Sequence, residues 1–382
     1  MTIVICKVLL GAMLTLFNLS TASDSRVAHE SVAGQNVTGA GGAPHIENAK
    51  VETRGVAGTL AATMADLEKN AAKPTWVGYG VRMVAGEGRI CCENYDSRGQ
   101  NCGRCELETD RDHWTNSGNA KDSGTLKLEG GEELIVLFRM QDRHVTRVKV
   151  ASDNCVLDAG GLPLLWLTGV QTAQSVAMLS AYARKNHAGE HEGDSIGNEA
   201  LTAIALHDGG AAQAALESFV APAQPEQLRK QASFWLGAAR GKEGLPVLQR
   251  MAKTDPSTEV RAQVAFALSV SKEPAALDEM IRMAHEDESG HVRGQAIFWL
   301  AQKAGKRAVG AIDGALENDP DTEVKKQAVF ALSQLPKDEG VPKLIQVAQT
   351  NRNRAVRKQA MFWLGQSEDA RALDFFEKVL TK

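Results

Sequence analysis

The chain has 382 residues, 43% of them hydrophobic, and its mean hydropathy of -0.24 is ordinary for a soluble globular protein of two or three domains. Its formal charge is -4 and its isoelectric point is about 6.2. Proteins that bind nucleic acid usually carry a basic surplus or a basic stripe, so we expect no nucleic acid as the main partner.

The amino terminus has the pattern of a secretory signal peptide over residues 1–22. Lys7 precedes an apolar run from Val8 to Leu19, and the small residues Ser20, Thr21 and Ala22 follow. A membrane anchor is the alternative, but the apolar run is shorter than the roughly 20 residues that span a bilayer. We therefore expect cleavage after about Ala22, export to the periplasm or the extracellular space, and a mature protein that is not integral to the membrane.

Residues 23–48 and 49–160 differ in composition and in predicted secondary structure. The first segment is rich in small and polar residues without an apolar face, which predicts a flexible leader. In the second, residues 50–54 predict a strand and Leu60–Ala71 predicts a helix, and turns are expected at Gly130-Gly131 and at Gln141–His144. We expect a small, mainly antiparallel β domain with strands at Trp76–Val84, Arg89–Asn94, Thr125–Leu128, Glu133–Met140 and Val145–Ala151.

Five cysteines follow the expected cleavage site, at Cys91, Cys92, Cys102, Cys105 and Cys155. An exported protein favours structural disulfides among them. Two alternatives stay open. The C-x-x-C spacing of Cys102 and Cys105 is that of a redox pair, although the sequence around it lacks the strand and helix that such a pair requires. The four cysteines between 91 and 105 also have ligand types that hold zinc.

The last 150 or so residues repeat a ten-residue phrase every 32 residues. A fixed period of this length is typical of stacked repeats that form a solenoid. Counting back from the first copy gives a degenerate sixth one at Ile196, so we expect the array to occupy residues 165–382. The regular copies are Leu228–Gly237, Val260–Ser269, Val292–Ala301, Val324–Ser333 and Val356–Gly365.

Each unit has the pattern of two amphipathic helices. Positions 1, 5, 8 and 9 of a copy are apolar, as in Val260, Val264, Ala267 and Leu268, and this spacing lies on one stripe of a helix. A second apolar helix pattern precedes every copy, and proline or glycine separates the two segments. We therefore expect an α+β protein of several domains, in which an α-α superhelix of about six helical hairpins follows the β domain.

An acidic residue in the turn precedes a basic residue at position 2 of three copies by six residues. With this feature the chain resembles the HEAT-repeat family, in the short variant shared with bilin-lyase-type repeats. The resemblance implies that these residues form a ladder between neighbouring units. The acid is replaced by Ala223 in the first copy and by Asn351 in the last, so we expect the ladder to fail at both ends. Its residues are Asp255, Arg261, Asp287, Arg293, Asp319 and Lys325.

Some HEAT-type proteins are enzymes, such as deoxyhypusine hydroxylase, whose helices present His-Glu pairs to two irons. The matching positions in this chain hold glutamine, preceded by lysine, alanine or glycine, and these residues do not supply the ligands that iron prefers. We expect instead that the glutamines hydrogen-bond between adjacent units. Bilin-lyase chemistry is disfavoured because the expected export separates the chain from such pigments. The glutamines are Gln231, Gln263, Gln295, Gln327 and Gln359.

Positions 7 and 8 of the copies form two aromatic columns. Position 7 is always phenylalanine, at 234, 266, 298, 330 and 362, while position 8 alternates as Trp235, Ala267, Trp299, Ala331 and Trp363. We expect the tryptophans to pack in the core and the phenylalanines to pack against the next unit, rather than to form an aromatic box for a ligand. The alternation suggests an ancestral unit of 64 residues.

The helical wheel predicts that positions 3, 6 and 10 are the most exposed. They are mostly small or apolar with a few lysines, so they suit a concave face that receives a protein or peptide. A smooth inner wall without a ligand is the alternative. The expected face includes Lys230, Ser233, Ala265, Ile297, Lys326, Val329, Lys358 and Met361.

Two polar clusters are interpreted as solvated loops. One comprises His187, His191 and the acids near them, and the other comprises Asp110, Asp112 and His113. We assign no catalytic residue, no metal ligand and no cofactor. The sequence thus favours an exported scaffold or adaptor that binds a protein or peptide, with the oligomeric state open. The alternative is a redox or metal-dependent enzyme with its chemistry between Cys91 and Cys155, for which the solenoid recruits substrate.

Overall fold

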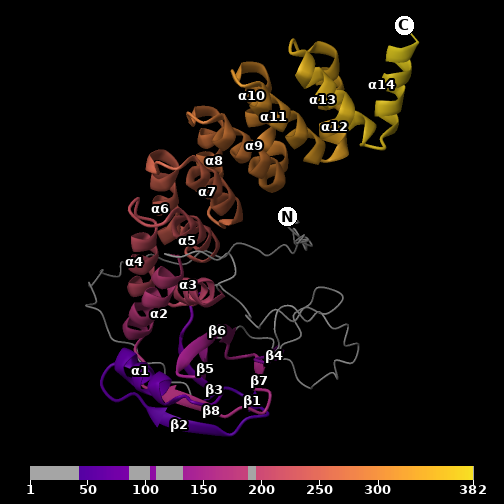
Figure 1. Ribbon diagram of the computed structural model, residues 1–382. Coiled ribbons are helices and arrows are strands. Elements are labelled where there is room, and N and C mark those ends of the chain that lie inside the picture. Colours follow the sequence, from indigo (N-terminus) through magenta and orange to yellow (C-terminus); the bar gives the residue numbers. More distant parts are fainter. Residues whose placement is uncertain (1–42, 86–103, 109–131, 188–194, 382) are drawn as a thin grey trace, which may run out of the picture. The chain divides into compact units, whose positions relative to one another are not determined.

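The computed structural model describes residues 43–85, 104–108, 132–187 and 195–381. Residues 37–382 form one compact unit, in which a region of strands is followed by a run of helices (Figure 1). The expected α+β class and the solenoid are confirmed. No helix in the described ranges is long and apolar enough to cross a membrane. The signal peptide, most of the leader, and the strands and turn expected near residues 89–94 and 125–131 lie outside these ranges.

Eight described strands form two sheets. The larger is of mixed direction and has the order β2-β8-β3-β5-β6. Strands β3, β5 and β6 are antiparallel neighbours, whereas β8 pairs in parallel with both β2 and β3. The bounds are β2 Val51–Gly55, β8 Leu164–Thr168, β3 Thr75–Arg82, β5 Glu133–Gln141 and β6 His144–Ser152.

The smaller sheet is parallel throughout. Its order is β1-β7-β4, with β1 at Ile46–Glu47, β7 at Val156–Asp158 and β4 at Arg104–Glu106. The expectation of a mainly antiparallel domain is therefore wrong. The chain returns late, after residue 160, and inserts β8 between two strands that run in the same direction. The sheet thus extends to Thr168, beyond the expected end of the β domain at residue 160 and into the range 165–382 expected for the solenoid.

In the strand region, the predicted helix and the predicted turn between β5 and β6 are found where the sequence placed them. Helix α1 (Leu60–Asn70) begins after Thr59, whose side-chain oxygen accepts a hydrogen bond from the Ala62 amide at 3.2 Å. The expected turn at Gln141–His144 joins β5 to β6, and Asp142 and Arg143 have φ angles of 53° and 64°. Two successive residues with positive φ are typical of a tight hairpin turn whose twist matches that of its strands.

Both faces of the larger sheet are buried, which explains the nearly continuous apolar run of β5. Val136 and Phe138 belong to a core that continues into the helices, while Ile135 and Leu137 pack in a second core with Trp166. The first core also contains residues of α3 and of every later hairpin. The sheet and the helical array therefore share one hydrophobic interior.

The helices form hairpins at the expected positions, and a helix α14 follows the last one (Figure 1). We call α5, α7, α9, α11 and α13 the second helices, because each contains one ten-residue copy and packs on the next in the series. The degenerate copy at Ile196 lies in α3. The bounds are α2 Thr172–His187, α3 Ser195–Leu206, α4 Gly210–Phe219, α5 Glu226–Ala239, α6 Gly241–Thr254, α7 Thr258–Val270, α8 Ala275–Glu286, α9 Gly290–Ala304, η1 Gly305–Ala308, α10 Val309–Asn318, α11 Thr322–Gln334, α12 Lys337–Thr350, α13 Arg354–Gly365 and α14 Ala370–Leu380.

Buried ion pairs join successive units. The Nε atoms of Arg229, Arg261 and Arg293 lie 3.0, 2.9 and 2.6 Å from a carboxylate oxygen of Asp255, Asp287 and Asp319, respectively. In each pair the Nη2 atom contacts the second oxygen, which gives the planar two-point geometry that arginine favours. Every arginine therefore pairs with the aspartate of the following unit.

The same groups also fix the turns within a unit. Arg261 donates from Nη1 to the Asp255 carbonyl at 2.9 Å, and Arg293 donates to the Asp287 carbonyl at 2.8 Å. The Asp255 and Asp287 carboxylates accept the backbone amides two residues later. Each aspartate thus holds its own turn and the arginine of the preceding unit together, so the ladder couples turn shape to stacking.

The ladder begins and ends where the residue types change. Lys325 has no carboxylate opposite it, because Asn351 stands there, and its ammonium donates to the Glu317 carbonyl at 3.1 Å. Asn351 still accepts the Asn353 amide at 2.9 Å, so the turn persists without the charge. At the other end Arg229 is a full member despite Ala223, because its partner belongs to the next unit. Sequence reasoning missed Arg229 for that reason.

A designed fourth ion pair tests the ladder. We expect Lys325→Arg and Asn351→Asp to be coupled favourably, by about 1–3 kcal/mol, because the double variant recreates the buried two-point pair. Asn351→Asp alone places a charge opposite the shorter lysine and is expected to lower the free energy of unfolding. Urea unfolding of the four members of the cycle measures the coupling, and purely additive effects would contradict the ladder.

Close contact between second helices gives another test. A Cβ atom at Gly237, position 10 of its copy, would overlap the Ala267 carbonyl oxygen of α7, whereas a Cβ at Gly365, the same position in the last copy, meets nothing within 4 Å. Gly237→Ala is expected to destabilise the protein by about 1–3 kcal/mol through overpacking. Gly365→Ala, the matched control, is expected to be neutral or to stabilise by up to about 1 kcal/mol. Equal effects in thermal unfolding would contradict this packing.

Candidate functional site

An unbroken series of aromatic ring contacts runs across all five second helices. Stacked pairs join Phe234 to Phe266 and Phe298 to Phe330, with centroids 5.7 and 5.8 Å apart. Tryptophan rings complete the series at centroid distances of 4.5–5.1 Å. In order, the rings are Trp235, Phe234, Phe266, Trp299, Phe298, Phe330, Trp363 and Phe362. We call them the ring series.

The alternation of tryptophan and alanine explains how the series continues. The units with Ala267 and Ala331 have no ring of their own at position 8. There the tryptophan of the following unit reaches back, so that Trp299 contacts Phe266 at 4.5 Å and Trp363 contacts Phe330 at 4.9 Å. The large and small residues share one space, and the period of the ring series is two units.

The rings lie at the surface rather than deep inside. All three tryptophans pack against the main core, yet they are only partly buried, and Phe362 is 54% exposed. The expectation that the tryptophans are core residues therefore holds only in part. Among the described residues, the Trp363 Nε1 atom is buried without a hydrogen-bond partner. The phenylalanines pack against neighbouring units as expected.

The glutamine column lies beside the ring series, and four of its members have unpaired amides. Gln263, Gln295, Gln327 and Gln359 are at least partly exposed, and their side chains make no hydrogen bond to any residue that the structure describes. The expectation that the column hydrogen-bonds between units is therefore wrong for these four residues. A Cβ atom at Gly294 of α9 would lie 3.3 Å from Cγ of Gln327, so the stem of Gln327 approaches the preceding second helix while its amide bonds to no described residue.

Half of the face expected from the helical wheel is buried. Ser233, Ala265, Ile297 and Val329 have no exposed surface, because position 6 faces the next second helix in the stack. A wheel that places the core on one side of the helix omits this lateral neighbour. Lys230, Lys326 and Met361 are partly exposed and Lys358 is exposed, so these residues remain available to a partner.

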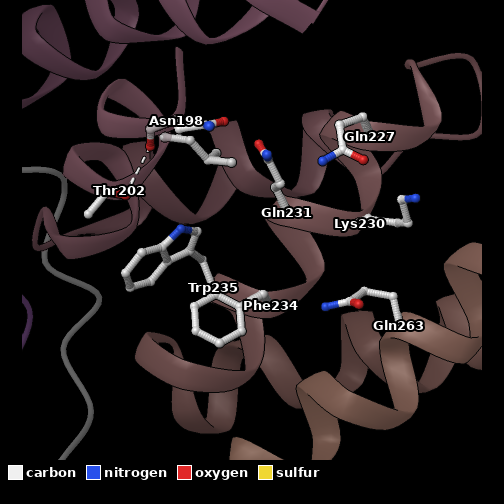
Figure 2. Close-up of a pocket in the computed structure, with 9 residues that line it drawn as sticks. Asn198, Thr202, Gln227, Lys230, Gln231, Phe234, Trp235 and Gln263 are labelled. Carbon is white, nitrogen blue, oxygen red and sulfur yellow. Dashed lines mark hydrogen bonds between the residues drawn. The ribbon is translucent and has the colours of Figure 1, made fainter. Parts of the chain in front are cut away.

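A pocket of about 420 Å³ lies at the first end of the ring series (Figure 2). Helices α3, α5 and α7 contribute its walls. Figure 2 shows the Trp235 and Phe234 rings below, the amides of Gln231 and Gln263 on two sides, and Asn198 and Thr202 opposite. The pocket combines flat apolar surface with amide and ammonium groups. Its lining is Asn198, Leu201, Thr202, Gln227, Lys230, Gln231, Phe234, Trp235 and Gln263.

Charge along this surface is balanced over α5 to α11 and basic at α13. Lys230 pairs with Glu226 at 3.5 Å, and Lys326 pairs with Glu323 at 2.9 Å. In contrast, residues 352–358 contain four basic residues and no acid, and the exposed Arg354 and Lys358 lie within 4 Å of no carboxylate in the described chain. We call the ring series, the glutamine column and the three lysines at 230, 326 and 358 the binding strip.

Tyr79, Ser175 and His207 form a buried chain of hydrogen bonds that resembles the serine–histidine pairs of hydrolytic enzymes. The Tyr79 hydroxyl lies 2.7 Å from the Ser175 hydroxyl, which lies 2.8 Å from Nε2 of His207. His207 donates from Nδ1 to the Ala203 carbonyl at 2.6 Å, so Nε2 accepts the serine proton. All three side chains are completely buried, which denies them a substrate. The arrangement joins β3 to α2 and α3.

Arg240 completes this junction. Its guanidinium donates to the His207 carbonyl at 2.8 Å and to the Gly209 carbonyl at 3.2 Å, and its positive charge lies close to the imidazole. Burial, and secondarily this charge, lowers the pKa of His207 to about 4. The imidazole therefore stays neutral over the physiological range.

The low pKa of His207 predicts a specific pH dependence. Because the folded pKa lies below the ordinary value of 6.5, its contribution to stability is complete above pH 6.5 and is lost as pH falls toward 4. The full loss is about 3 kcal/mol. Urea unfolding between pH 7 and 4.5 should show this slope in the native chain and not in His207→Gln, and identical slopes would contradict the assignment.

The cysteine and acidic candidates are only partly described. Cys105 and Cys155 are buried together in the second core. Cys91, Cys92, Cys102, Asp110, Asp112, His113 and His191 lie outside the described residues, and His187 ends α2. Within the described ranges no three His, Cys, Asp or Glu side chains are grouped as metal ligands.

Comparison with known proteins identifies the repeat. Residues 213–301 and 312–382 match the family model of HEAT repeats. This part of the chain forms a HEAT-like array. The matched residues begin in α4 and contain all five ten-residue copies, so the binding strip is a surface of this array. No curated protein matches the chain significantly.

Three solved structures are similar to parts of the chain. The CpcE–CpcF complex of phycocyanin lyase from Nostoc is 23% identical, with a TM-score of 0.31, and the match covers 40% of this chain and 98% of that one. Human deoxyhypusine hydroxylase in complex with glycerol is 16% identical, with a TM-score of 0.26 and coverages of 54% and 90%. Kap121p bound to Pho4p is 13% identical, with a TM-score of 0.34 and coverages of 55% and 27%. These similarities assign no activity to this chain.

Proposed function

We propose that this protein is an exported scaffold that binds a protein partner through the binding strip of its HEAT array. The observation that carries the proposal is the ring series, a line of partly exposed aromatic side chains that extends over five repeats beside unpaired amides. Aromatic residues are enriched where proteins bind one another, because they bury much area at a small entropic cost.

The strip has the composition of a protein interface rather than of a solvated face. Its lysines are few, and two of them pair with glutamates. The rings remain partly exposed, and Phe362 is 54% exposed. A bound partner covers this apolar surface.

Export and disulfides are part of the proposal. The pattern of residues 1–22 supports export, and the joint burial of Cys105 and Cys155 in the small second core supports disulfide bonds in that region. Intact mass spectrometry of protein made in the source cells checks both, because cleavage and each disulfide change the mass. Metal analysis of the same sample tests the alternative of a metal-dependent enzyme.

Capture of partners from source-cell extract tests the binding strip. The triple variant Gln263→Ala, Gln327→Ala and Phe362→Ser removes exposed groups of the strip without touching the core. We expect it to retain at least about 10-fold less of the partner than the native chain, because three contacts of about 0.5–1.5 kcal/mol are lost.

The matched control carries the same changes on another surface. Gln346→Ala and Gln349→Ala are on α12, and Leu373→Ser on α14 replaces a residue that is 65% exposed. Circular dichroism should show that both variants are folded. If the control loses the partner as strongly as the strip variant does, the strip is not the binding surface.

A further inference from the structure

The spacing of the binding strip restricts the conformation of its ligand. Equivalent side chains recur once per unit, and packed helices lie about 8–10 Å apart. A polyproline II helix repeats after three residues and about 9.3 Å, so the same edge of such a ligand meets every unit. A β-strand repeats after two residues and about 6.8 Å, which loses register after one unit.

The hydrogen-bonding groups of the strip complement the same conformation. Gln263, Gln295, Gln327 and Gln359 offer one unpaired side-chain amide per unit. Trp235 and Trp299 each add one indole N–H donor that has no acceptor in the described chain, whereas the Trp363 nitrogen is buried out of reach of a ligand. A polyproline II backbone makes no internal hydrogen bonds, so all of its carbonyls are available as acceptors.

The ring series and the pocket favour proline in the ligand. Phe234 and Trp235 form one wall of the pocket (Figure 2). The remaining rings continue from there across the array. Flat aromatic surface packs well against the rigid pyrrolidine ring, and a ligand that is already extended loses little entropy on binding. Uncharged residues match α5 to α11, where the strip lysines Lys230 and Lys326 pair with glutamates.

Charge complementarity fixes one end of the ligand. Arg354 and Lys358 of α13 are exposed and lie within 4 Å of no described carboxylate, while Phe362 and Trp363 of the same helix end the ring series. Acidic residues in the ligand are therefore favoured over α13.

We infer that the binding strip holds an extended, proline-rich polypeptide segment in the polyproline II conformation, with acidic residues at the end that lies over α13. The inference rests on the proposed function and names the chemistry of the partner. The pocket lined by α3, α5 and α7 receives the uncharged end.

Fluorescence anisotropy with labelled peptides tests the inference on the full chain. The probe has repeated Pro-Pro-Ala triplets followed by Asp-Glu-Asp. A second peptide replaces proline with glycine, and a third ends in Asn-Gln-Asn. We expect saturable binding of the probe, at least about 10-fold weaker binding of the glycine peptide, and about 3- to 10-fold weaker binding of the neutral-ended one.

Three variants locate the probe. Gln295→Ala with Gln327→Ala should weaken its binding about 10-fold, while Gln346→Ala with Gln349→Ala on α12 should leave it unchanged. Lys358→Glu should weaken binding of the acidic-ended peptide and leave that of the neutral-ended peptide unchanged. Equal binding of the proline and glycine peptides, equal binding by both glutamine variants, or binding of a neutral oligosaccharide in place of any peptide would overturn the inference.

The proposed function and this inference fail in different ways. If the strip variant loses its captured partner and no proline-rich peptide binds, the strip is a protein-binding surface for a ligand of another conformation, and the inference is overturned alone. If neither the partner nor the peptide depends on the strip, both are overturned.

Discussion

The two-point pair between the arginine of one unit and the aspartate of the next is the contact on which the array depends. Arg261 shows the arrangement in full, because one guanidinium holds Asp287 through Nε and Nη2 and its own turn through the Asp255 carbonyl. A planar group with fixed donors tolerates little rotation. Each unit is therefore set on its neighbour at a defined angle, and the contact between Gly237 and α7 brings the two backbones close.

Regular stacking converts a sequence period into a surface period. Position 4 is a glutamine and position 7 is a phenylalanine in every unit, and position 8 is a tryptophan in every second unit. The rings form a binding surface because they are aligned. A single ring would be a small exposed apolar group, whereas eight rings in contact form one continuous apolar surface. The ion pairs at the turns thus set the alignment of the rings at positions 7 and 8 of the second helices.

The sequence predicted what depends on local pattern and missed what depends on lateral neighbours. Helical hairpins follow from apolar spacing, and the ladder follows from the recurring acid and base. The burial of Ile297 and the unpaired amide of Gln295 depend on where the adjacent helix passes, and one helical wheel contains no such information. The place of β8 in the larger sheet and the contact between Ser175 and His207 join residues that no period relates. Of the candidate site, the phenylalanine column was predictable, while the pocket was not.

The continuous core from β5 through α3 into the hairpins changes how the first layer of the array is protected. A stack of like units always has two terminal layers whose apolar faces need a cover. Here Val148, Val150 and Phe138 of the sheet lie in the same core as Leu201 and Ile204 of α3, and the Tyr79–Ser175–His207 contacts fasten the two together. The strand region therefore acts as the amino-terminal lid of the solenoid. An excised array that begins at residue 172 would expose this layer to water and associate with other copies through it.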